Sequence, residues 1–439
     1  MKFSFKQALL WLTTYIVLAI SPLLIAYVGE PQPSRSYLVE FSVGLGFVGM
    51  AVLLLQFVLT GRFKHIASSL GLDSMLQFHR KTGLIAFFFI LAHPLILFVY
   101  SPTYLTALNP TDNLPRAVAL SAVLVALVTV VVTTLWRKSL RVPYEWWRAG
   151  HGILALFIVF IGLVHILQVG FYVSTWWKQT LWIAMTAGAM LFLINTRVIR
   201  PILRRRKPYR VSEVRKERGN AYTLVLTAEG HPGMKFAAGQ FVWLSLSSSP
   251  FSLQQHPFSI SSSSLRSDRM EMTIKELGDF TSTIKGLKPG DLAFLEGPFG
   301  TFTLEADVSK NVVFIVGGVG ITPIISMLRT LSDKADQHSL VLIYGSRNRE
   351  DTLFLDELEE LESSLNLKIV HVLENPPDDW MGESGFINAE ILNRHMPKKP
   401  AEFTYYVCGP EPLMDFAETY LRRSGVPLRQ IFSERFNIV

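Results

Sequence analysis

Two stretches of equal length decide the fold: HRKTGLIAFFFILAH over residues 79–93 and HGILALFIVFIGLVH over residues 151–165. Histidines stand at their four ends: His79, His93, His151 and His165. The two histidines of each stretch are 14 residues apart. In a helix that spacing completes four turns less about 40° and rises about 21 Å. Each pair therefore lies on nearly one helix face, with one histidine near either leaflet of a bilayer.

Six apolar runs fill the first half of the chain, and they are predicted at residues 8–28, 37–60, 77–100, 117–136, 149–170 and 177–197. Each approaches the roughly 20 residues that cross a bilayer as a helix. The third and fifth runs hold the histidines and cross in the same direction. The histidines therefore form an inner level, His79 with His151, and an outer level, His93 with His165.

Charge follows the same division of the chain. Residues 1–207 hold 19 Lys and Arg against 5 Asp and Glu, whereas residues 208–439 hold 23 against 30. In the first half the basic residues gather in alternate loops, which places both termini in the cytoplasm by the positive-inside rule. Because the basic excess belongs to membrane loops, we expect membrane lipid and no nucleic acid as a partner.

Composition narrows the chemistry. Of the 439 residues, 49% are hydrophobic and 18% are charged, whereas ordinary soluble domains are about 25% charged. The single cysteine, Cys408, excludes an internal disulfide, a four-cysteine zinc site and a cysteine-held iron–sulfur cluster. Any metal must be held by histidine or carboxylate, or arrive inside a cofactor.

Paired imidazoles at two levels suit the axial ligands of two haems. Because both axial positions would be filled, such haems would pass electrons rather than bind a gas. Two other interpretations stay open. The histidines bond only to neighbouring helices, or they form a zinc site or a proton path, although carboxylates are nearly absent from these runs.

After residue 207 the pattern changes to alternating strands, such as residues 222–227 and 240–246. Further strands are predicted at 311–316, 339–344, 367–372 and 404–407, with helices at 323–331, 353–364 and 412–423. Strands that alternate with helices predict a parallel, doubly wound sheet. We expect three domains: a six-helix transmembrane domain at 1–207, an antiparallel β-barrel at 208–306 and an α/β doubly wound domain at 307–439.

Two segments of the second domain suit a flavin. HPFSISS over residues 256–262 places an aromatic next to a serine, which can pack on a flavin ring and bond its edge. KELGDFTS over residues 275–282 offers a glycine turn with hydroxyl and backbone N–H groups for a pyrophosphate. The candidate flavin-binding residues are His256, Pro257, Phe258, Ser259, Lys275, Gly278, Thr281 and Ser282. Taken singly, each segment also fits an ordinary turn.

Three segments of the third domain suit a nicotinamide dinucleotide. GGVGITP over residues 317–323 joins a strand to a helix, and its glycines let the backbone approach a pyrophosphate. The second segment, residues 344–349, carries a serine and an arginine that suit a ribose 2′-phosphate and so favour NADPH over NADH. The third segment, residues 408–412, ends the last long strand, where a cysteine would lie beside the nicotinamide. The candidates are Gly317, Gly318, Gly320, Thr322, Pro323, Ser346, Arg347, Cys408, Gly409 and Pro410.

These motifs occur in one order over about residues 10–437, and a terminal Glu434-Arg435-Phe436 follows them. In that order the chain resembles the NADPH oxidase and ferric reductase superfamily, and its second half resembles ferredoxin–NADP⁺ reductases. The resemblance implies one FAD, two b-type haems and a nicotinamide donor, NADPH with NADH as a further option. It implies catalytic roles for Ser259, Cys408 and Phe436, the last as the aromatic that covers the flavin. The first flavin motif of the wider reductase family begins with Arg, whereas here it begins with His256.

The expected function is electron transfer from cytoplasmic NADPH through FAD and two haems to an acceptor on the far side of the membrane. Oxygen, giving superoxide, is the first expectation; a ferric chelate, a quinone or a periplasmic protein partner are the alternatives. The outer loops carry few charges, which fits oxygen. The absence of a calcium-binding loop or activation extension in the sequence indicates a bacterial inner-membrane enzyme that requires no activator.

Overall fold

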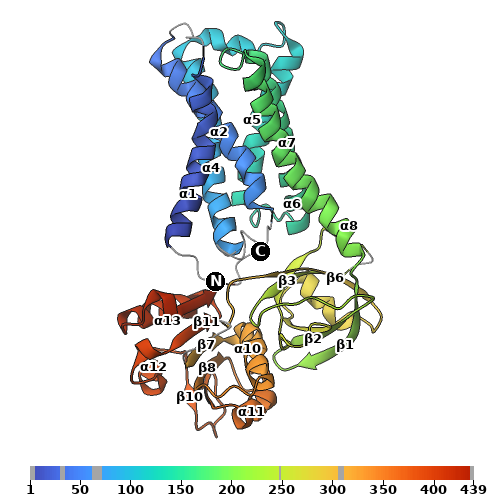
Figure 1. Cartoon of the computed structure of the whole chain (residues 1–439), viewed down its shortest axis with the longest axis vertical. Coiled ribbons are helices and arrows are strands. Elements are labelled where there is room, and N and C mark those ends of the chain that lie inside the picture. The colour runs from blue at the N-terminus through green and yellow to red at the C-terminus, as the bar shows by residue number, and fades with distance from the viewer. Residues whose placement is uncertain (1–4, 30–34, 62–71, 247–248, 305–310, 436–439) are drawn as a thin grey trace. The chain divides into compact units, whose positions relative to one another are not determined.

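The computed structural model describes residues 5–29, 35–61, 72–246, 249–304 and 311–435 (Figure 1). These residues divide into two compact units. The membrane unit comprises Phe3–Phe63 and Ser74–Arg200, and the C-terminal unit consists mainly of Pro201–Val439. Each unit is described by itself below.

Within the described residues, six helices are long and apolar enough to cross a membrane. They are α1 (Phe5–Ala26), α2 (Tyr37–Leu59), α4 (Leu72–Tyr100), α5 (Leu114–Leu135), α6 (Tyr144–Val169) and α7 (Trp176–Ile194). A 3₁₀ helix, η1 (Pro102–Leu108), lies between α4 and α5, and a π-helical turn, η2 (Asn195–Ile199), continues α7 into α8 (Arg200–Arg205). The six predicted spans are confirmed, with ends that differ by a few residues.

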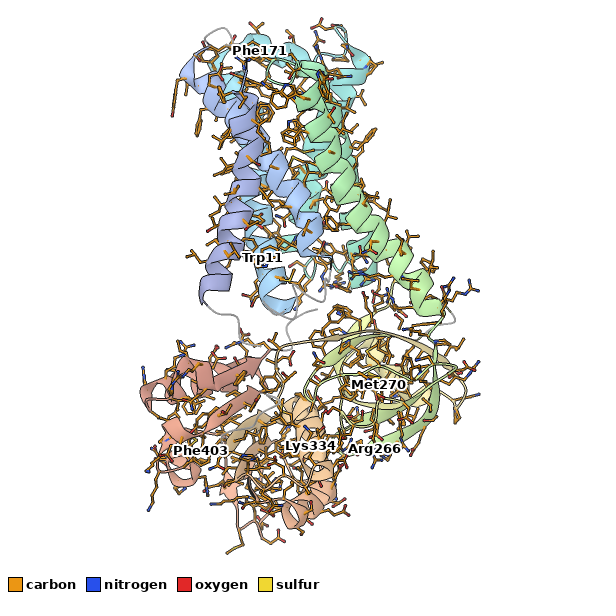
Figure 2. The ribbon with its side chains drawn as sticks, viewed as in Figure 1. Trp11, Phe171, Arg266, Met270, Lys334 and Phe403 are labelled. Atoms are coloured by element: carbon orange, nitrogen blue, oxygen red, sulfur yellow. The ribbon has the colours of Figure 1, made fainter. Side chains whose placement is uncertain are left out.

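In the membrane unit, many large apolar side chains lie on the surface, unlike in a soluble protein. Large apolar side chains are exposed along the helices, such as Val99 at 87% and Leu10 at 67%, and carbon-rich side chains line the whole unit (Figure 2). Such surfaces suit hydrocarbon, because a helix satisfies its own backbone hydrogen bonds. Of the six spans, α2 buries the largest share of its residues, and its Phe47 and Met50 belong to the core of the unit.

The C-terminal unit begins with an antiparallel sheet. Its strands are β1 (Tyr209–Glu217), β2 (Ala221–Ala228), β3 (Phe241–Leu246), β4 (His256–Ser259), β5 (Arg269–Lys275) and β6 (Leu292–Phe299). Their spatial order is β4-β3-β6-β1-β2-β5. Two short helices, α9 (Asp279–Ser282) and η3 (Ile284–Gly286), precede β6. The predicted strands at 222–227 and 240–246 correspond to β2 and β3.

The predicted antiparallel barrel is confirmed in its broad form, although the hydrogen-bonded sheet is not closed, because β4 and β5 are the two ends of its strand order. Strand β4 has four residues, and directly after it the N–H of Ser261 donates to the carbonyl of Glu271 on β5 at 2.7 Å. The carbonyl of Ser262 accepts a hydrogen bond from Ser326, and the N–H of Ser264 donates one to Thr330. The segment after β4 therefore bonds both to β5 and to residues more than 60 positions further along the chain.

The second sheet is parallel throughout its described pairings. Its strands are β7 (Val312–Gly317), β8 (Leu340–Ser346), β9 (Leu367–Leu373), β10 (Glu383–Ser384), β11 (Thr404–Cys408) and β12 (Ile431–Glu434), in the order β10-β9-β8-β7-β11-β12. The helices of this part are η4 (Gly318–Gly320), α10 (Ile321–Asp333), α11 (Leu355–Ser364), α12 (Ala389–His395), η5 (Pro400–Glu402), α13 (Glu411–Arg423) and η6 (Leu428–Gln430).

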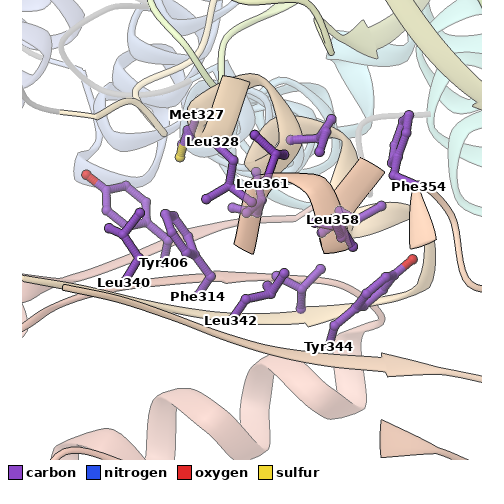
Figure 3. Packing of buried hydrophobic residues seen from close by; sticks show 14 of the residues in the cluster. Phe314, Met327, Leu328, Leu340, Leu342, Tyr344, Phe354, Leu358, Leu361 and Tyr406 are labelled. Atoms are coloured by element: carbon purple, nitrogen blue, oxygen red, sulfur yellow. The ribbon is translucent and has the colours of Figure 1, made fainter. Parts of the chain in front are cut away.

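Alternate residues of each central strand face opposite sides of this sheet. Phe314 and Leu342 pack with α10 and α11, as Figure 3 shows, together with Tyr344 and Tyr406. Their neighbours Val313 and Ile343 pack with α12 and α13 on the other side. Helices cover both faces, so the predicted doubly wound sheet is confirmed. The first core also takes Ala238 and Phe302 from the antiparallel part, which joins the two sheets into one unit.

Candidate functional site

The membrane unit brings its four histidines together in two pairs on α4 and α6. The ring centres of His79 and His151 lie 6.3 Å apart, and those of His93 and His165 lie 6.4 Å apart. Two imidazole nitrogens bound about 2 Å to either side of one metal would place the ring centres about 6 Å apart. Both pairs therefore have the spacing of axial ligands, with a helical rise between them.

Two histidines are enough to bind a metal ion stably only if its other ligands come from a cofactor. Within the described residues, no group of three or more His, Cys, Asp or Glu side chains is placed to hold a metal ion. A bare zinc site needs three or four protein ligands, whereas a haem iron takes its remaining ligands from the macrocycle. The pairs thus fit a haem better than a free metal ion.

The two levels differ in what holds their histidines. The Nδ1 of His93 lies 2.9 Å from the carbonyl oxygen of Ser42, which can only accept, so Nδ1 carries the proton. The hydroxyl of Ser42 donates to the carbonyl of His93 at 2.7 Å. At the inner level the Nδ1 of His79 is buried and has no hydrogen-bond partner in the described part of the chain. The Nδ1 of His151 lies 3.4 Å from the hydroxyl oxygen of Thr134.

The first flavin candidate segment forms the edge strand β4. The hydroxyl of Ser259 is buried and lacks a hydrogen-bond partner among the described residues, which is rare for a buried polar atom. The ring of Phe258 stacks on Phe280 at 6.0 Å, and the ring of His256 lies 4.2 Å from the same Phe280. An orphaned hydroxyl next to an aromatic cluster fits a ligand that brings its own polar edge.

The second flavin candidate segment closes on itself. Lys275 ends β5, and the turn after it leads into the four-residue helix α9. The N–H groups of Leu277 and Gly278 both donate to Thr281 Oγ1 at 2.9 Å. Ser282 donates to the carbonyl of Asp279. The N–H groups of Leu277 and Gly278 and the hydroxyl of Ser282 are therefore satisfied within the turn itself.

The nucleotide candidates converge at the carboxyl ends of β7 and β11. A Cβ on Gly320 would stand 2.5 Å from the carbonyl oxygen of Cys408, and one on Gly317 would stand 2.8 Å from Pro410. A Cβ on Gly409 would lie 2.9 Å from the backbone nitrogen of Gly317. The two turns therefore pack so closely that none of these three glycines has room for a side chain. In open α/β sheets this edge, where neighbouring strands lead to opposite sides, is where ligands bind.

Two side chains fix the turn before α10. Thr322 donates to the carbonyl of Val319 at 3.0 Å, and Pro323 is buried in the first turn of the helix. The hydroxyl of Tyr344 donates to the carbonyl of Gly318 at 3.3 Å and accepts from the N–H of Leu353 at 3.2 Å. Sequence reasoning missed Tyr344, which reads as an ordinary buried strand residue until the turn beside it is known.

The cysteine candidate lies inside the core. Cys408 is fully buried on β11, among the residues that pack between the sheet and α10. Burial, with a smaller contribution from Glu434, raises the pKa of the thiol well above its usual range. Cys408 is therefore a neutral thiol, and its carbonyl, rather than its sulfur, contacts the glycine turn.

The phosphate candidates behave differently from each other. The hydroxyl of Ser346 is buried and lies 2.7 Å from the hydroxyl of Thr352. Arg347 follows it at the end of β8 and is exposed. Phe436, the predicted cover of the flavin, lies outside the described residues, which end at Arg435.

Sequence reasoning also missed Arg329, which ties the two sheets of the C-terminal unit together. Its guanidinium donates to both carboxylate oxygens of Glu357 at 2.6 and 2.8 Å, to Glu271 at 3.1 Å and to the carbonyl of Ser261 at 2.9 Å. Burial alone would lower the pKa of Arg329, but the hydrogen bonds and charges of Glu357 and Glu271 raise it overall. A cavity of about 900 Å³ beside it is lined by charged residues that include Arg215 and Asp356.

Three families match successive parts of the chain. Residues 45–162 match the family described as a ferric reductase like transmembrane component, residues 206–289 an FAD-binding domain, and residues 314–419 an oxidoreductase NAD-binding domain. The matched regions contain three of the four membrane histidines, namely His79, His93 and His151. They also contain the flavin candidates of residues 256–282 and the nucleotide candidates.

Curated relatives match the C-terminal half. The reductase component DmpP of phenol 2-monooxygenase from Pseudomonas sp. strain CF600 is 34% identical over 209 residues, 46% of this chain and 58% of that protein. The plasma membrane-associated coenzyme Q6 reductase PGA3 of Saccharomyces cerevisiae is 30% identical over 168 residues, 37% of this chain and 54% of that protein. The chain spans little more than half the length of these relatives.

Among solved structures, the FAD/NAD-binding domain of nitric oxide dioxygenase from Vibrio cholerae is 20% identical. It aligns with 52% of this chain and 98% of its own, at a TM-score of 0.47. The three family matches, in this order, make the chain an oxidoreductase with a ferric reductase-like transmembrane component ahead of FAD-binding and NAD-binding domains, an arrangement that matches the NADPH oxidase and ferric reductase superfamily.

Proposed function

We propose that the protein carries electrons from cytoplasmic NADPH, through bound FAD and two b-type haems, to oxygen on the far side of the membrane, giving superoxide. The observation that carries this proposal is the matched spacing of the two histidine pairs, 6.3 and 6.4 Å between ring centres. A soluble reductase tethered to a membrane would need neither pair.

His79 and His151 would hold the inner haem, and His93 and His165 would hold the outer haem. The tautomer of His93 supports this assignment. Because its Nδ1–H donates to Ser42, its Nε2 keeps the lone pair that a metal needs. When bound, FAD exchanges electrons in pairs or singly and the two haems pass them one at a time, which is the redox chemistry that the chain itself lacks.

In the C-terminal unit, Ser259 and Phe258 would bind the flavin ring. The buried Ser259 hydroxyl has no hydrogen-bond partner among the described residues, so it is available to a ligand. The close-packed turn formed by Gly317, Gly320 and Gly409 would admit the pyrophosphate and nicotinamide of the donor. The exposed guanidinium of Arg347 would take the 2′-phosphate, which supports NADPH over NADH. Cys408 would act through the backbone position of this turn, because its thiol is buried.

The acceptor is proposed from the cations on the predicted outer side. Arg35 pairs with Glu40 at 3.0 Å and lies over the ring of Phe171 at 3.8 Å. Lys178 is buried and donates to the carbonyl of Ala26 at 2.8 Å. Because Arg35 is paired and Lys178 is buried, Arg116 is the exposed cation left among these three to attract an anionic ferric chelate, whereas neutral oxygen needs none. Ferric chelate reduction, or delivery to a quinone or a periplasmic protein, is the alternative.

We also propose the setting of this activity: a bacterial inner membrane with both chain termini in the cytoplasm and no required activator. The domain boundaries 1–207, 208–306 and 307–439 remain our proposal. The orientation follows from the basic residues of alternate loops.

The decisive experiment follows NADPH oxidation by purified, FAD-loaded protein in detergent under air, with a superoxide reporter with and without superoxide dismutase. We expect a dismutase-sensitive signal that accounts for the electrons of NADPH. Haem that NADPH reduces with little superoxide formation, but with fast reduction of a ferric chelate, would overturn oxygen as the acceptor. Protein that purifies without haem would overturn the transmembrane route itself.

A further inference from the structure

Helix α2 contributes no histidine to either pair, yet its residue Ser42 contacts His93 of the outer pair. Ser42 is fully buried and makes reciprocal contacts with His93, 51 residues further along the chain. Its carbonyl oxygen accepts from the ring Nδ1–H at 2.9 Å, and its hydroxyl donates to the backbone carbonyl of His93 at 2.7 Å. The hydroxyl oxygen also lies 3.1 Å from Nδ1. Ring and backbone of His93 are therefore both fixed by one residue.

One turn further along α2 lies Gly46, and because it has no side chain, the ring of His93 fits against it. A Cβ on Gly46 would stand 3.3 Å from Cγ and 3.4 Å from Nδ1 of His93. That is closer than ordinary van der Waals contact, so a side chain here would push against the ring. Ser42 and Gly46 are four residues apart and lie on the same face of α2. Together they form a seat for His93.

At the inner level, no described residue holds a histidine in a comparable way. The Nδ1 of His79 is buried without a hydrogen-bond partner among the described residues, and His151 has a 3.4 Å contact to Thr134. The hydroxyl of Thr134 donates to the carbonyl of Val130 at 2.6 Å, so its oxygen can only accept weakly from the ring. The two pairs share a spacing but not a support.

We propose that Ser42 and Gly46 are positioning residues for the outer histidine pair, which fix the tautomer and orientation of His93 and thereby make the outer haem site electronically distinct from the inner one. This inference rests on the proposed function, since it assigns the two pairs to haems. A ring N–H that donates to a carbonyl makes the opposite nitrogen a stronger ligand. Stronger donation favours ferric iron, so the seat holds the midpoint potential of the outer site down.

The test is a potentiometric titration of the haem absorption bands in purified, full-length protein. Gly46→Ala crowds the ring and lengthens its hydrogen bond, so the potential of the outer component should rise. Ser42→Ala removes the hydroxyl contacts but keeps the carbonyl, so it should give a smaller rise. The matched control is Gly44→Ala on the same helix, because its added Cβ would meet only Leu23 side-chain atoms at 3.7 and 3.8 Å. The inner component should move in none of the three.

Two measurements separate the possible failures. A His79→Ala variant, which keeps only the outer pair, identifies which component is the outer one, and a pyridine haemochrome assay counts haem in every variant. Wild-type protein with two haems, but with an outer component that neither Gly46→Ala nor Ser42→Ala moves, would overturn the seat alone. The seat would also be overturned if the potentials of both components shifted equally, or if Gly44→Ala shifted the outer potential as well. Wild-type protein without two haems would overturn the proposed function beneath it.

Discussion

The membrane unit and the C-terminal unit use opposite means to build a site. In the membrane unit four imidazole side chains stand out against an apolar background, and the outer surface is made of residues such as Val99. In the C-terminal unit the candidate nucleotide site is made of turns that leave no room for a side chain at Gly317, Gly320 and Gly409. The difference follows from the surroundings. Hydrocarbon makes every polar side chain costly, so few are present, whereas the edge of a soluble sheet can carry many polar side chains. Side-chain identity therefore matters most in one unit and backbone shape in the other.

The largest effect is expected from His93→Ala, which tests whether side chains carry the function of the membrane unit. Removal of one axial ligand should delete the outer haem and abolish acceptor reduction, while NADPH still reduces the flavin. Haem content and stopped-flow absorbance measure the two steps. His338→Ala, at a partly exposed histidine of the C-terminal unit, is the control and should change neither. Unchanged haem content in His93→Ala would sink the assignment.

The next effect tests whether side chains can matter as much in the C-terminal unit. Arg329→Met leaves the carboxylates of Glu271 and Glu357 partly buried and without their shared cation. Loss of one member of a buried pair costs about 3 kcal/mol, which should lower the temperature of flavin release by about 6–12 °C. Flavin fluorescence during heating measures it.

The matched control for Arg329→Met is Arg218→Met, whose ion pair with Asp356 is largely exposed. Exposed pairs contribute about 0–1 kcal/mol, so this variant should release flavin at nearly the wild-type temperature. Equal shifts in the two variants would mean that Arg329 does not tie the sheets together.

Backbone shape is tested directly by Gly320→Ala. The new methyl group would lie 2.5 Å from the carbonyl oxygen of Cys408, so the two turns must separate. Overpacking of this kind costs about 1–3 kcal/mol, and we expect a raised KM for NADPH with haem content unchanged. Gly286→Ala, where nothing lies within 4 Å of the added atom, should keep the wild-type KM. If both variants bind NADPH normally, the nucleotide does not use this turn.

A smaller effect separates Arg347 from Ser346. The Ser346 hydroxyl already bonds to Thr352, so preference for the 2′-phosphate should depend on Arg347. Arg347→Ala should raise the KM for NADPH about fivefold, the size expected for an exposed charge pair, and leave the KM for NADH unchanged. A preference that survives this change would place the phosphate elsewhere.

The smallest effect concerns Cys408. Its thiol pKa is raised by burial, so the folded state favours the neutral form. That contribution to stability is complete below about pH 8.5, the ordinary thiol pKa, and is lost as the pH rises toward the folded value. Wild-type protein should lose stability above this pH more steeply than Cys408→Ala, as flavin-release temperatures would show. Rapid alkylation of the thiol in the native protein would contradict its burial.

Much of the fold follows from local patterns. The six spans, the strands β7, β8, β9 and β11 and the helices α10, α11 and α13 are predicted to within a few residues, because hydropathy and period are properties of neighbouring residues. The short elements β10, β12 and α12 are not. What holds the segment after β4 could not be predicted in this way. Ser262 accepts a hydrogen bond from Ser326 and Ser264 donates one to Thr330, more than 60 residues further along the chain, and no local pattern contains these contacts.

By itself, the sequence determined the six apolar spans, the spacing of the four histidines and the glycine turns, since each depends on the transfer free energy or backbone freedom of residues close together in the chain. The tertiary structure alone decided what holds them. It buried the thiol of Cys408, left the Ser259 hydroxyl without a hydrogen-bond partner among the described residues, set Ser42 and Gly46 against His93 and placed Arg329 between two sheets. These contacts join distant residues, and only the packing of whole elements brings such residues within hydrogen-bonding distance.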